Sequence, residues 1–315
     1  MRAVVTGAAG FIGSHLAEAL LEAGFTVKGI DCFSDYYPRF IKEGNISCLK
    51  EQRGFSLLEA DLVNVDLQDL LQSGDYVFHQ AAQAGVRASW GEDFQIYSRS
   101  NILATQQLLE AAKEVGVEKF IYASSSSVYG AADSIPMQEE DITRPVSPYG
   151  VSKLAGENLC QLYHHNFGLP AVSLRYFTVY GERQRPDMAF HIFIRRILAG
   201  EEIEIFGDGR QSRNFSYVGD VVKANMQAAE ADVGGEIINI GGPGERINLL
   251  TAVETIEDIT GLEAEINYQP RVSGDVKHTE ADLTRAEKLL DYEPEVKLRT
   301  GLEREVKYIK ELYSL

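Results

Sequence analysis

Cysteine is scarce in this chain of 315 residues, which contains only Cys32, Cys48 and Cys160. Their spacing matches no zinc-binding pattern, and three thiols leave one over in any disulfide scheme. We therefore expect neither a disulfide framework nor a metal site. Free thiols are typical of a reducing compartment, so we predict a cytoplasmic protein.

The sequence also lacks long apolar runs, and it has fewer basic than acidic residues. No run approaches the roughly 18 apolar residues that a membrane helix needs, and the amino terminus enters a glycine turn at Gly7 too early for a signal peptide. The chain has 30 basic and 47 acidic residues, a net charge of −17. This balance argues against nucleic acid or an anionic membrane as a partner. A phosphorylated substrate would have to be met by local arginines.

A glycine turn near the amino terminus predicts a dinucleotide site. Residues 3–6 form a predicted buried strand, a helix follows as far as Gly24, and a second strand over 25–30 ends at Asp31. Glycines at such a turn let backbone N–H groups approach a pyrophosphate, at a helix N-terminus that favours anions. Asp31 would accept hydrogen bonds from both ribose hydroxyls and repel a 2′-phosphate, which favours NAD over NADP. The alternative is a purely structural glycine-rich turn.

Further strands and helices alternate along the amino-terminal half. Strands are predicted over 76–79, 120–123 and 171–174, and helices over 101–115 and beyond Pro148. Such alternation is typical of an α/β, Rossmann-type doubly wound parallel sheet, in which ligands bind beyond the carboxyl ends of the strands. The glycine turn, Asp31, the region of Ala81 and the serine run 124–127 all fall at that edge.

Tyr149 and Lys153 lie four residues apart on a predicted helix that Pro148 can begin. Residues at this spacing share one helix face, and an ammonium there can lower a tyrosine pKa that starts near ~10. The pair would give a base that works at neutral pH. The serine run upstream lies at a strand end and could supply a catalytic hydroxyl. Four consecutive serines could also be part of a loop that has no catalytic role. His79 lies inside an apolar strand and is interpreted as a hydrogen-bonded core residue.

The pattern beyond Leu174 becomes irregular. Helices are predicted over 189–198, 248–259 and 300–313, and a short strand over 203–206. Segments 220–229 and 236–240 look like a helix and a strand that return to the main sheet. We therefore predict a cofactor-binding domain over 1–174, with returns near 215–242 and 276–290, and a smaller interleaved C-terminal α/β substrate lobe that covers most of 175–315.

Six motifs spread along the chain resemble one family. They are TGAAGFIGSH at 6–15, SSSSVYG at 124–130, SPYGVSK at 147–153, RYFTVYG at 175–181, IFGDGRQSRNFSYVGD at 205–220 and INIGG at 238–242. Together they are similar to the extended short-chain dehydrogenase/reductase family, in its NAD-dependent nucleotide-sugar epimerase/dehydratase branch. The resemblance implies NAD as cofactor, a UDP-sugar as substrate and a homodimer formed through two helices of each subunit.

The resemblance also implies roles for individual residues. Catalysis would involve Tyr149, Lys153 and Ser125, with Tyr149 as the base and Lys153 on the nicotinamide ribose. NAD would be bound by Gly7, Gly10, Phe11, Ile12, Gly13, Asp31, Asp61, Leu62, Ala81, Ala82, Tyr149, Lys153 and Tyr176.

Two positions and one stretch of sequence discriminate within the branch. Dehydratases and UDP-glucuronate decarboxylases usually carry an acid just before Val-Tyr-Gly, where this chain has Ser127. UDP-galactose 4-epimerases usually have Asn where it has Thr178. The stretch from Arg175 to Phe190 is most similar to UDP-glucuronate 4-epimerases. The predicted reaction converts UDP-glucuronate to UDP-galacturonate through a 4-keto intermediate, with hydride returned to the opposite face.

Other functions remain as alternatives. They are a UDP-glucose or UDP-N-acetylglucosamine 4-epimerase, a UDP-glucuronate decarboxylase, and an NAD-binding regulator without catalysis. The choice among the enzymes depends on the residues expected around the substrate.

Substrate contacts are expected from hydroxyls, arginines and two aromatic rings. The resemblance places Ser125, Ser126, Ser127 and Thr178 around the sugar, Arg213 on the diphosphate, and Phe190 and Phe206 near uracil, although both rings suit a core equally well. The planar guanidinium of Arg185 can bind two oxygens at once, which suits the sugar carboxylate or the diphosphate. Arg87 could reach an anion. Related enzymes place an arginine two residues before a Gly-Asp, but Val272 stands there and Arg271 one residue earlier, which leaves the second diphosphate arginine open.

Overall fold

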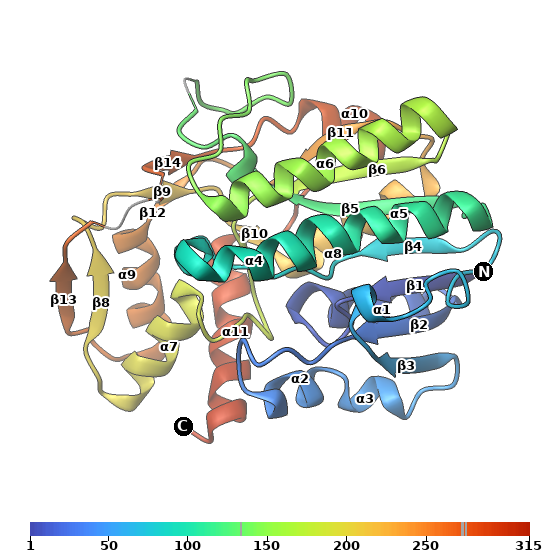
Figure 1. The fold of residues 1–315 in the computed structure, drawn as a ribbon. Helices are drawn as coiled ribbons and strands as arrows, with labels where there is room; N and C mark the ends of the chain where they lie inside the picture. Colours follow the sequence, from blue (N-terminus) through green and yellow to red (C-terminus); the bar gives the residue numbers. More distant parts are fainter. Residues whose placement is uncertain (133, 272–273, 275) are drawn as a thin grey trace.

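The computed structural model describes residues 1–132, 134–271, 274 and 276–315. Its centre is a parallel sheet of seven strands in the order β11-β6-β5-β4-β1-β2-β3 (Figure 1). The strands are β1 (Arg2–Thr6), β2 (Thr26–Asp31), β3 (Phe55–Glu59), β4 (Tyr76–His79), β5 (Lys119–Ser125), β6 (Ala171–Tyr176) and β11 (Ile237–Ile240). The order reverses between β1 and β4, which creates the crevice where doubly wound sheets bind ligands.

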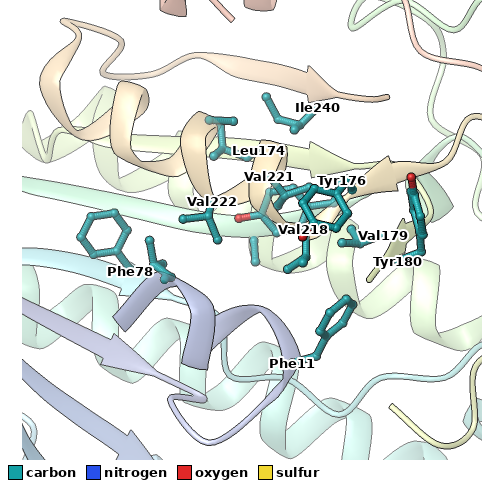
Figure 2. Packing of buried hydrophobic residues seen from close by; sticks show 14 of the residues in the cluster. Phe11, Phe78, Leu174, Tyr176, Val179, Tyr180, Val218, Val221, Val222 and Ile240 are labelled. Atoms are coloured by element: carbon teal, nitrogen blue, oxygen red, sulfur yellow. The ribbon is translucent and has the colours of Figure 1, made fainter. Parts of the chain in front are cut away.

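Helices cover both faces of this sheet. The helices α1 (Phe11–Glu22) and α8 (Val218–Glu230) pack on one face, and α5 (Ala104–Val115) and α6 (Pro148–Phe167) on the other. Successive strand residues point to opposite faces, so Val4 and Val5, both fully buried, belong to different apolar clusters. Figure 2 shows valines of α8 packed beside Leu174 and Tyr176 of β6. Burial on both faces explains why these strands are almost continuously apolar.

Shorter helices complete the main body of the protein. The α2 (Arg39–Asn45) and α3 (Ser47–Lys50) helices follow β2, and α10 (Thr284–Leu290) lies against β11. A continuous helical segment leads into α5 through α4 (Phe94–Tyr97) and the widened turn η4 (Ser98–Leu103). None of the helices in the described ranges combines the length and apolar character that crossing a membrane requires.

The C-terminal lobe packs at one end of the main sheet (Figure 1). It contains α7 (Ala189–Ala199), α9 (Leu249–Thr260) and α11 (Leu298–Tyr313). Three small sheets join them: β7 (Val179–Tyr180) with β10 (Ser216–Tyr217), β8 (Ile203–Phe206) with β13 (Ile266–Gln269), and β9 (Ser212–Arg213) with β12 (Ile247–Asn248) and β14 (His278–Thr279). This part of the chain lies beside the carboxyl ends of the main strands.

The predicted fold class is confirmed, with differences in detail. The edge strand β3 was not predicted, because its mixed and partly exposed pattern gives little periodicity. The strand predicted over 120–123 extends to Ser125, so two of the serines belong to β5 rather than to a loop. The predicted boundary near residue 174 falls inside β6.

A buried ion pair fixes α6 against the sheet. Arg175 of β6 donates two hydrogen bonds to Glu157 of α6, from Nε to Oε2 at 2.9 Å and from Nη2 to Oε1 at 2.6 Å. Ser124 Oγ at the end of β5 donates to the same Oε2 at 2.8 Å. Both charged residues are about as buried as the core, with 2% and 1% of their surface exposed. The orientation of α6 on β5 and β6 therefore depends on charges held away from water.

Candidate active site

A cleft of about 560 Å³ lies at the carboxyl edge of the main sheet. This volume is in the range of sites that hold small molecules and cofactors. The wall includes every residue predicted to bind NAD: Gly7, Gly10, Phe11, Ile12, Gly13, Asp31, Asp61, Leu62, Ala81, Ala82, Tyr149, Lys153 and Tyr176. The fold thus brings into one cleft residues from several distant segments of the chain.

The glycine turn has no space for a side chain at Gly7 or at Gly13. Gly7 has a φ of +71°, and a Cβ on it would lie 2.8 Å from the backbone nitrogen of Ala81. A Cβ on Gly13 would lie 2.1 Å from the Gly7 carbonyl oxygen. The α1 helix begins at Phe11 with no side-chain cap, so its first N–H groups are left for a ligand. This cradle fits a dinucleotide pyrophosphate.

Replacing Gly13 by alanine should damage this turn. The backbone of Gly7 would have to move, which we expect to weaken NAD binding and to lower the free energy of unfolding by about 1–3 kcal/mol. Gly44 offers a matched control, because it lies in α2 with nothing within 4 Å of its added Cβ. Gly44→Ala should leave NAD binding unchanged. Calorimetric titration with NAD and thermal unfolding measure both effects, and equal behaviour of the two variants would contradict the close fit.

Asp31 is held rigidly at the end of β2. Its Oδ2 accepts a hydrogen bond from Ala9 N at 3.0 Å, and its Oδ1 accepts one from Phe33 N at 2.8 Å. The buried ammonium of Lys42 lies 3.7 Å from Oδ1. The carboxylate is therefore fixed beside the glycine turn, in the place that a ribose-binding acid occupies in this type of fold.

Tyr149 and Lys153 lie on the first turns of α6. Ser147 caps the helix by accepting a hydrogen bond from Gly150 N at 3.1 Å, and Pro148 occupies the first turn. Lys153 Nζ donates to the Ala123 carbonyl at 2.7 Å. Burial lowers the pKa of Lys153 to about 7.

The environment of Tyr149 differs from the sequence prediction. Burial raises the pKa of Tyr149 above its usual value, while the positive charge of Arg185 and a hydrogen bond with Ser125 lower it. The effect of Lys153 on this pKa stays a prediction. Arg185, which also lines the cleft, supplies a favourable positive charge that was not expected from the sequence.

The predicted sugar-binding hydroxyls lie at the ends of two neighbouring strands, and Ser125 hydrogen-bonds Tyr149. Ser125 ends β5, Ser126 and Ser127 form the turn that follows, and Thr178 follows β6. Because β5 and β6 are adjacent, with Ser125 opposite Tyr176, these hydroxyls lie at neighbouring strand ends. All four residues are half-buried. None of them is among the described residues that line the cleft.

Arg87 and Phe206 meet across the two parts of the protein. The guanidinium carbon of Arg87, in the turn Arg87–Ser89, lies 4.2 Å from the centre of the Phe206 ring on β8. A cation over an aromatic face at this distance is an attractive contact. The structure therefore joins two of the predicted substrate residues directly.

Three of the predicted substrate residues are not among the described residues that line the cleft: Phe190, Arg213 and Arg271. Phe190 is 1% exposed and packs with its ring centre 4.6 Å from that of Phe215, as a core aromatic does. Arg213 donates hydrogen bonds to the carbonyl oxygens of Ser212, Val276 and Lys277. Arg271 is exposed after β13. Val272 and Asp275, which bear on the second diphosphate arginine, lie outside the described residues.

His79 is a hydrogen-bonded core residue, as expected. Its Nδ1 lies 2.7 Å from Thr6 Oγ1 and its Nε2 lies 2.9 Å from Thr105 Oγ1. Burial lowers its pKa to about 3, so the ring is neutral at pH 7. In the part of the chain that the structure describes, no group of three or more His, Cys, Asp or Glu side chains could hold a metal ion.

Comparison with known proteins decides the family. The model of the NAD dependent epimerase/dehydratase family matches residues 3–241. The chain belongs to this family. The UDP-glucuronate 4-epimerase of Thermodesulfobacterium geofontis is 41% identical over 99% of this chain and 97% of its own length. A Bacillus subtilis relative, described as an uncharacterized UDP-glucose epimerase, is 45% identical over 100% of this chain and 99% of its own length.

Solved structures of this epimerase/dehydratase family have the same fold. The UDP-glucuronic acid 4-epimerase of Bacillus cereus, crystallised with UDP-glucuronic acid and NAD, is 49% identical, with a TM-score of 0.97 over 99% of this chain and 100% of that chain. The predicted family and fold class are therefore confirmed. The predicted cofactor, NAD, is that of the family.

A polar contact network that this epimerase/dehydratase fold builds around α6 was missed from the sequence. Asn101 Nδ2 donates to Ser152 Oγ at 2.9 Å and its Oδ1 accepts from Gln83 N at 2.7 Å, while Ser152 Oγ donates to the Tyr149 carbonyl at 2.8 Å. Asn101 lies in the widened turn η4, a feature frequent at functional sites. No spacing in the sequence marks such a turn, so only the structure reveals that the turn supports the helix of Tyr149.

Proposed function

We propose that the protein is an NAD-dependent 4-epimerase of a UDP-sugar, with UDP-glucuronate and UDP-galacturonate as its substrate and product. The observation that carries the proposal is the position of Tyr149, which lines the cleft of the glycine turn and Asp31, within reach of the Arg185 charge and of a hydrogen bond with Ser125. Similarity to epimerases over nearly the whole chain supports it.

The residues have distinct roles in this reaction. Tyr149 takes the proton of the sugar 4-hydroxyl and later returns it, and Ser125 hydrogen-bonds the same oxygen. Lys153 holds the nicotinamide ribose, Asp31 the adenosine ribose, and the glycine turn the pyrophosphate. NAD, when bound, supplies the hydride acceptor and donor for reversible oxidation at C4. The protein contributes orientation and charge.

A uronate substrate must also be protected from decarboxylation. A 4-keto uronate is a β-keto acid, which loses CO₂ when the breaking C–C bond lines up with the carbonyl π system. Hydroxyls from Ser126, Ser127 and Thr178, together with the charge of Arg185, can hold the carboxylate out of that alignment. Ser127 stands where related decarboxylases carry an acid, and this favours epimerisation.

Thr178→Ala should therefore raise the yield of pentose product relative to epimer. The substitution removes one hydroxyl of the clamp and retains the backbone bond from Ser216 N to the Thr178 carbonyl, 2.9 Å long. Product ratios from UDP-glucuronate can be measured by NMR or mass spectrometry. Ser216→Ala serves as a control for a nearby hydroxyl that is fully buried. An unchanged ratio in Thr178→Ala would count against the clamp.

The substrate itself is tested by direct comparison. The protein, with NAD, is incubated separately with UDP-glucuronate, UDP-glucose and UDP-N-acetylglucosamine, and the products are followed by NMR. We expect the highest kcat/KM for UDP-glucuronate, with UDP-galacturonate as product. A preference for UDP-glucose would favour the function named for the Bacillus subtilis relative. Absence of turnover on all three would favour a regulator that binds NAD.

The assembly and location stay predictions. We propose a homodimer formed through the segment before α5 and through α6, which expose apolar side chains at Leu103, Val151 and Leu162, 42%, 47% and 52% exposed. Light scattering on the purified protein tests this.

The three cysteines are free in the structure, and a reducing cytoplasm remains the predicted compartment. The division into residues 1–174 and 175–315 also stays a proposal, as do contacts of Arg87, Phe206, Arg213 and Arg271 with UDP.

A further inference from the structure

Residues 181–188 form a segment, here called the strap, that connects the two parts of the protein. Arg183 has a φ of 63°, a left-handed conformation that is uncommon for a non-glycine residue. Its side chain donates to Glu18 of α1 with bonds of 3.0 and 2.7 Å, and to Ser14 Oγ at 3.3 Å. At the start of the strap, Gly181 N donates to Glu305 Oε2 at 3.0 Å. The strap is therefore anchored to α1 on one side and to α11 on the other.

Arg185, in the middle of the strap, is held by a second set of contacts. Its Nε and Nη2 donate to the two carboxylate oxygens of Asp187, each at 2.9 Å. The hydroxyl of Tyr36, in the loop after β2, donates to Asp187 Oδ2 at 3.1 Å. The guanidinium carbon of Arg185 also lies 5.8 Å from the centre of the Tyr36 ring. A bidentate pair of this kind fixes the plane of the guanidinium as well as its position.

The pairing uses one edge of the guanidinium. Nε and Nη2 bind Asp187, so the Nη1 end of the fork is directed away from the carboxylate. Arg185 lines the same cleft as Tyr149, and its charge acts on the Tyr149 hydroxyl. The Arg185 and Asp187 side chains are 21% and 35% exposed, so the pair lies at the border between protein and solvent. An unrestrained arginine at such a border would sample several rotamers and spend part of its time in water.

Tyr149 is surrounded by several charged or titratable groups. Tyr97 of α4, Tyr122 of β5 and Arg185 of the strap interact electrostatically with Tyr149. Lys153 of α6 and both Tyr36 and Tyr37 of the loop after β2 line the same cleft, and Asp187 is paired with Arg185. Tyr97 has its ring centre 6.3 Å from that of Tyr149. Burial keeps Tyr97 and Tyr122 neutral, since it raises the pKa of each above its usual value. Burial lowers the pKa of Lys153 to about 7, so Arg185 is the permanent positive charge among these groups.

We propose that Asp187 and Tyr36 are positioning residues for the epimerase reaction, and that they hold the charge of Arg185 beside Tyr149 so that the tyrosinate can form. The proposal rests on the function proposed above. Neither residue touches the reacting atoms in this account, since both act through Arg185. The loop that follows the ribose-binding acid Asp31 thereby also supports the catalytic base, because it contributes Tyr36.

A simpler role for Asp187 makes the opposite prediction. If its carboxylate acted only as a negative charge near the site, its removal would make tyrosinate formation easier and lower the apparent pKa of the base. If it acts by holding Arg185, its removal lets the guanidinium move away and raises that pKa. The direction of the shift therefore separates positioning from a direct charge effect.

The experiment measures the pH dependence of kcat/KM for UDP-glucuronate in the NAD-loaded enzyme, where the rising limb reports the base of the free enzyme. We expect Asp187→Asn to move this limb upward by about 0.5–1 pH unit. Tyr36→Phe, which keeps every charge, should move it in the same direction by less. Asp187→Glu should restore most of the parental profile. Asp35→Asn, a matched loss of charge at an exposed position next to Tyr36, should not move the limb upward.

A second readout does not depend on turnover. Tyrosinate absorbance is titrated in the NAD-loaded protein, and the curve of Tyr149→Phe is subtracted to isolate Tyr149. Asp187→Asn should shift this difference curve to higher pH. If the parent enzyme turns over none of the UDP-sugars, the proposed function fails while this titration still decides on positioning. A downward shift, or no shift, in Asp187→Asn would overturn the positioning role.

Discussion

Tyr149→Phe should lower kcat by about 10²–10⁴-fold, the usual contribution of a positioned acid–base group. The substitution removes only the hydroxyl, and the ring that lies 6.3 Å from Tyr97 remains to fill its place. Tyr149 is one of many residues in the cofactor cleft, and the glycine turn and Asp31 are untouched. NAD should therefore stay bound, which chromatography of the nucleotide released on denaturation would measure. Single-turnover kinetics with UDP-glucuronate would measure the loss of chemistry.

Two comparisons strengthen this test. Ser125→Ala removes a neighbour that hydrogen-bonds Tyr149, and should reduce kcat by a smaller factor than Tyr149→Phe. The thermal unfolding temperature of Tyr149→Phe should remain close to that of the parent, since no cavity is created. Near-normal turnover in Tyr149→Phe would remove this residue from the role of base, and loss of NAD would assign it a structural role instead.

Arg175→Met should lower the free energy of unfolding by about 3–5 kcal/mol, the usual effect of removing one partner from a buried ion pair. The substitution leaves the Glu157 carboxylate in a site where 1% of the residue is exposed, with Ser124 as its remaining side-chain donor. Because Glu157 lies on α6, the helix of Tyr149 and Lys153 should loosen as well. Urea denaturation followed by circular dichroism measures the effect.

The double variant Arg175→Met, Glu157→Leu provides the decisive control. Apolar side chains of similar volume need no partner, so the double variant should recover much of the stability that Arg175→Met loses. Arg39→Met tests an exposed arginine that is paired with Glu43 and Glu59, and it should change stability far less. A small effect of Arg175→Met alone would show that water or another group satisfies Glu157.

Local patterns made much of the fold predictable from the sequence. The glycine turn, the acid at the end of β2 and the helix that carries Tyr149 are each encoded within about 30 consecutive residues. Parallel strands that alternate with helices place their carboxyl ends at one edge, so the glycine turn, Asp31 and the region of Ala81 could be predicted to lie together. The other cofactor residues were implied by the resemblance to the family. Ser147 and Pro148 together specify where α6 begins, and this fixes the face on which Tyr149 lies.

Contacts between distant segments could not be predicted in this way. Tyr36 meets Asp187, and Arg175 meets Glu157, through tertiary packing that leaves no periodicity in the sequence. The pKa of Tyr149 depends on such contacts, so the charge of Arg185 was not foreseen from the sequence, which pointed to the near neighbour Lys153 alone. The position of Phe190 in the core could not be predicted either, because an aromatic residue gives the same sequence pattern in a core as in a ligand site.

The order of the sheet has a consequence for how the chain folds during synthesis. β6 is fully buried and pairs with β5 on one side and with β11 on the other, and β11 is made only after the first part of the C-terminal lobe, including α7 and β8. A nascent chain that ends before Ile237 therefore exposes the backbone of an apolar strand at an open edge, which is a surface prone to pair with other chains. The strand that closes this edge belongs to the returning segment. The cofactor-binding half therefore completes its main sheet only after the first part of the C-terminal lobe has been made.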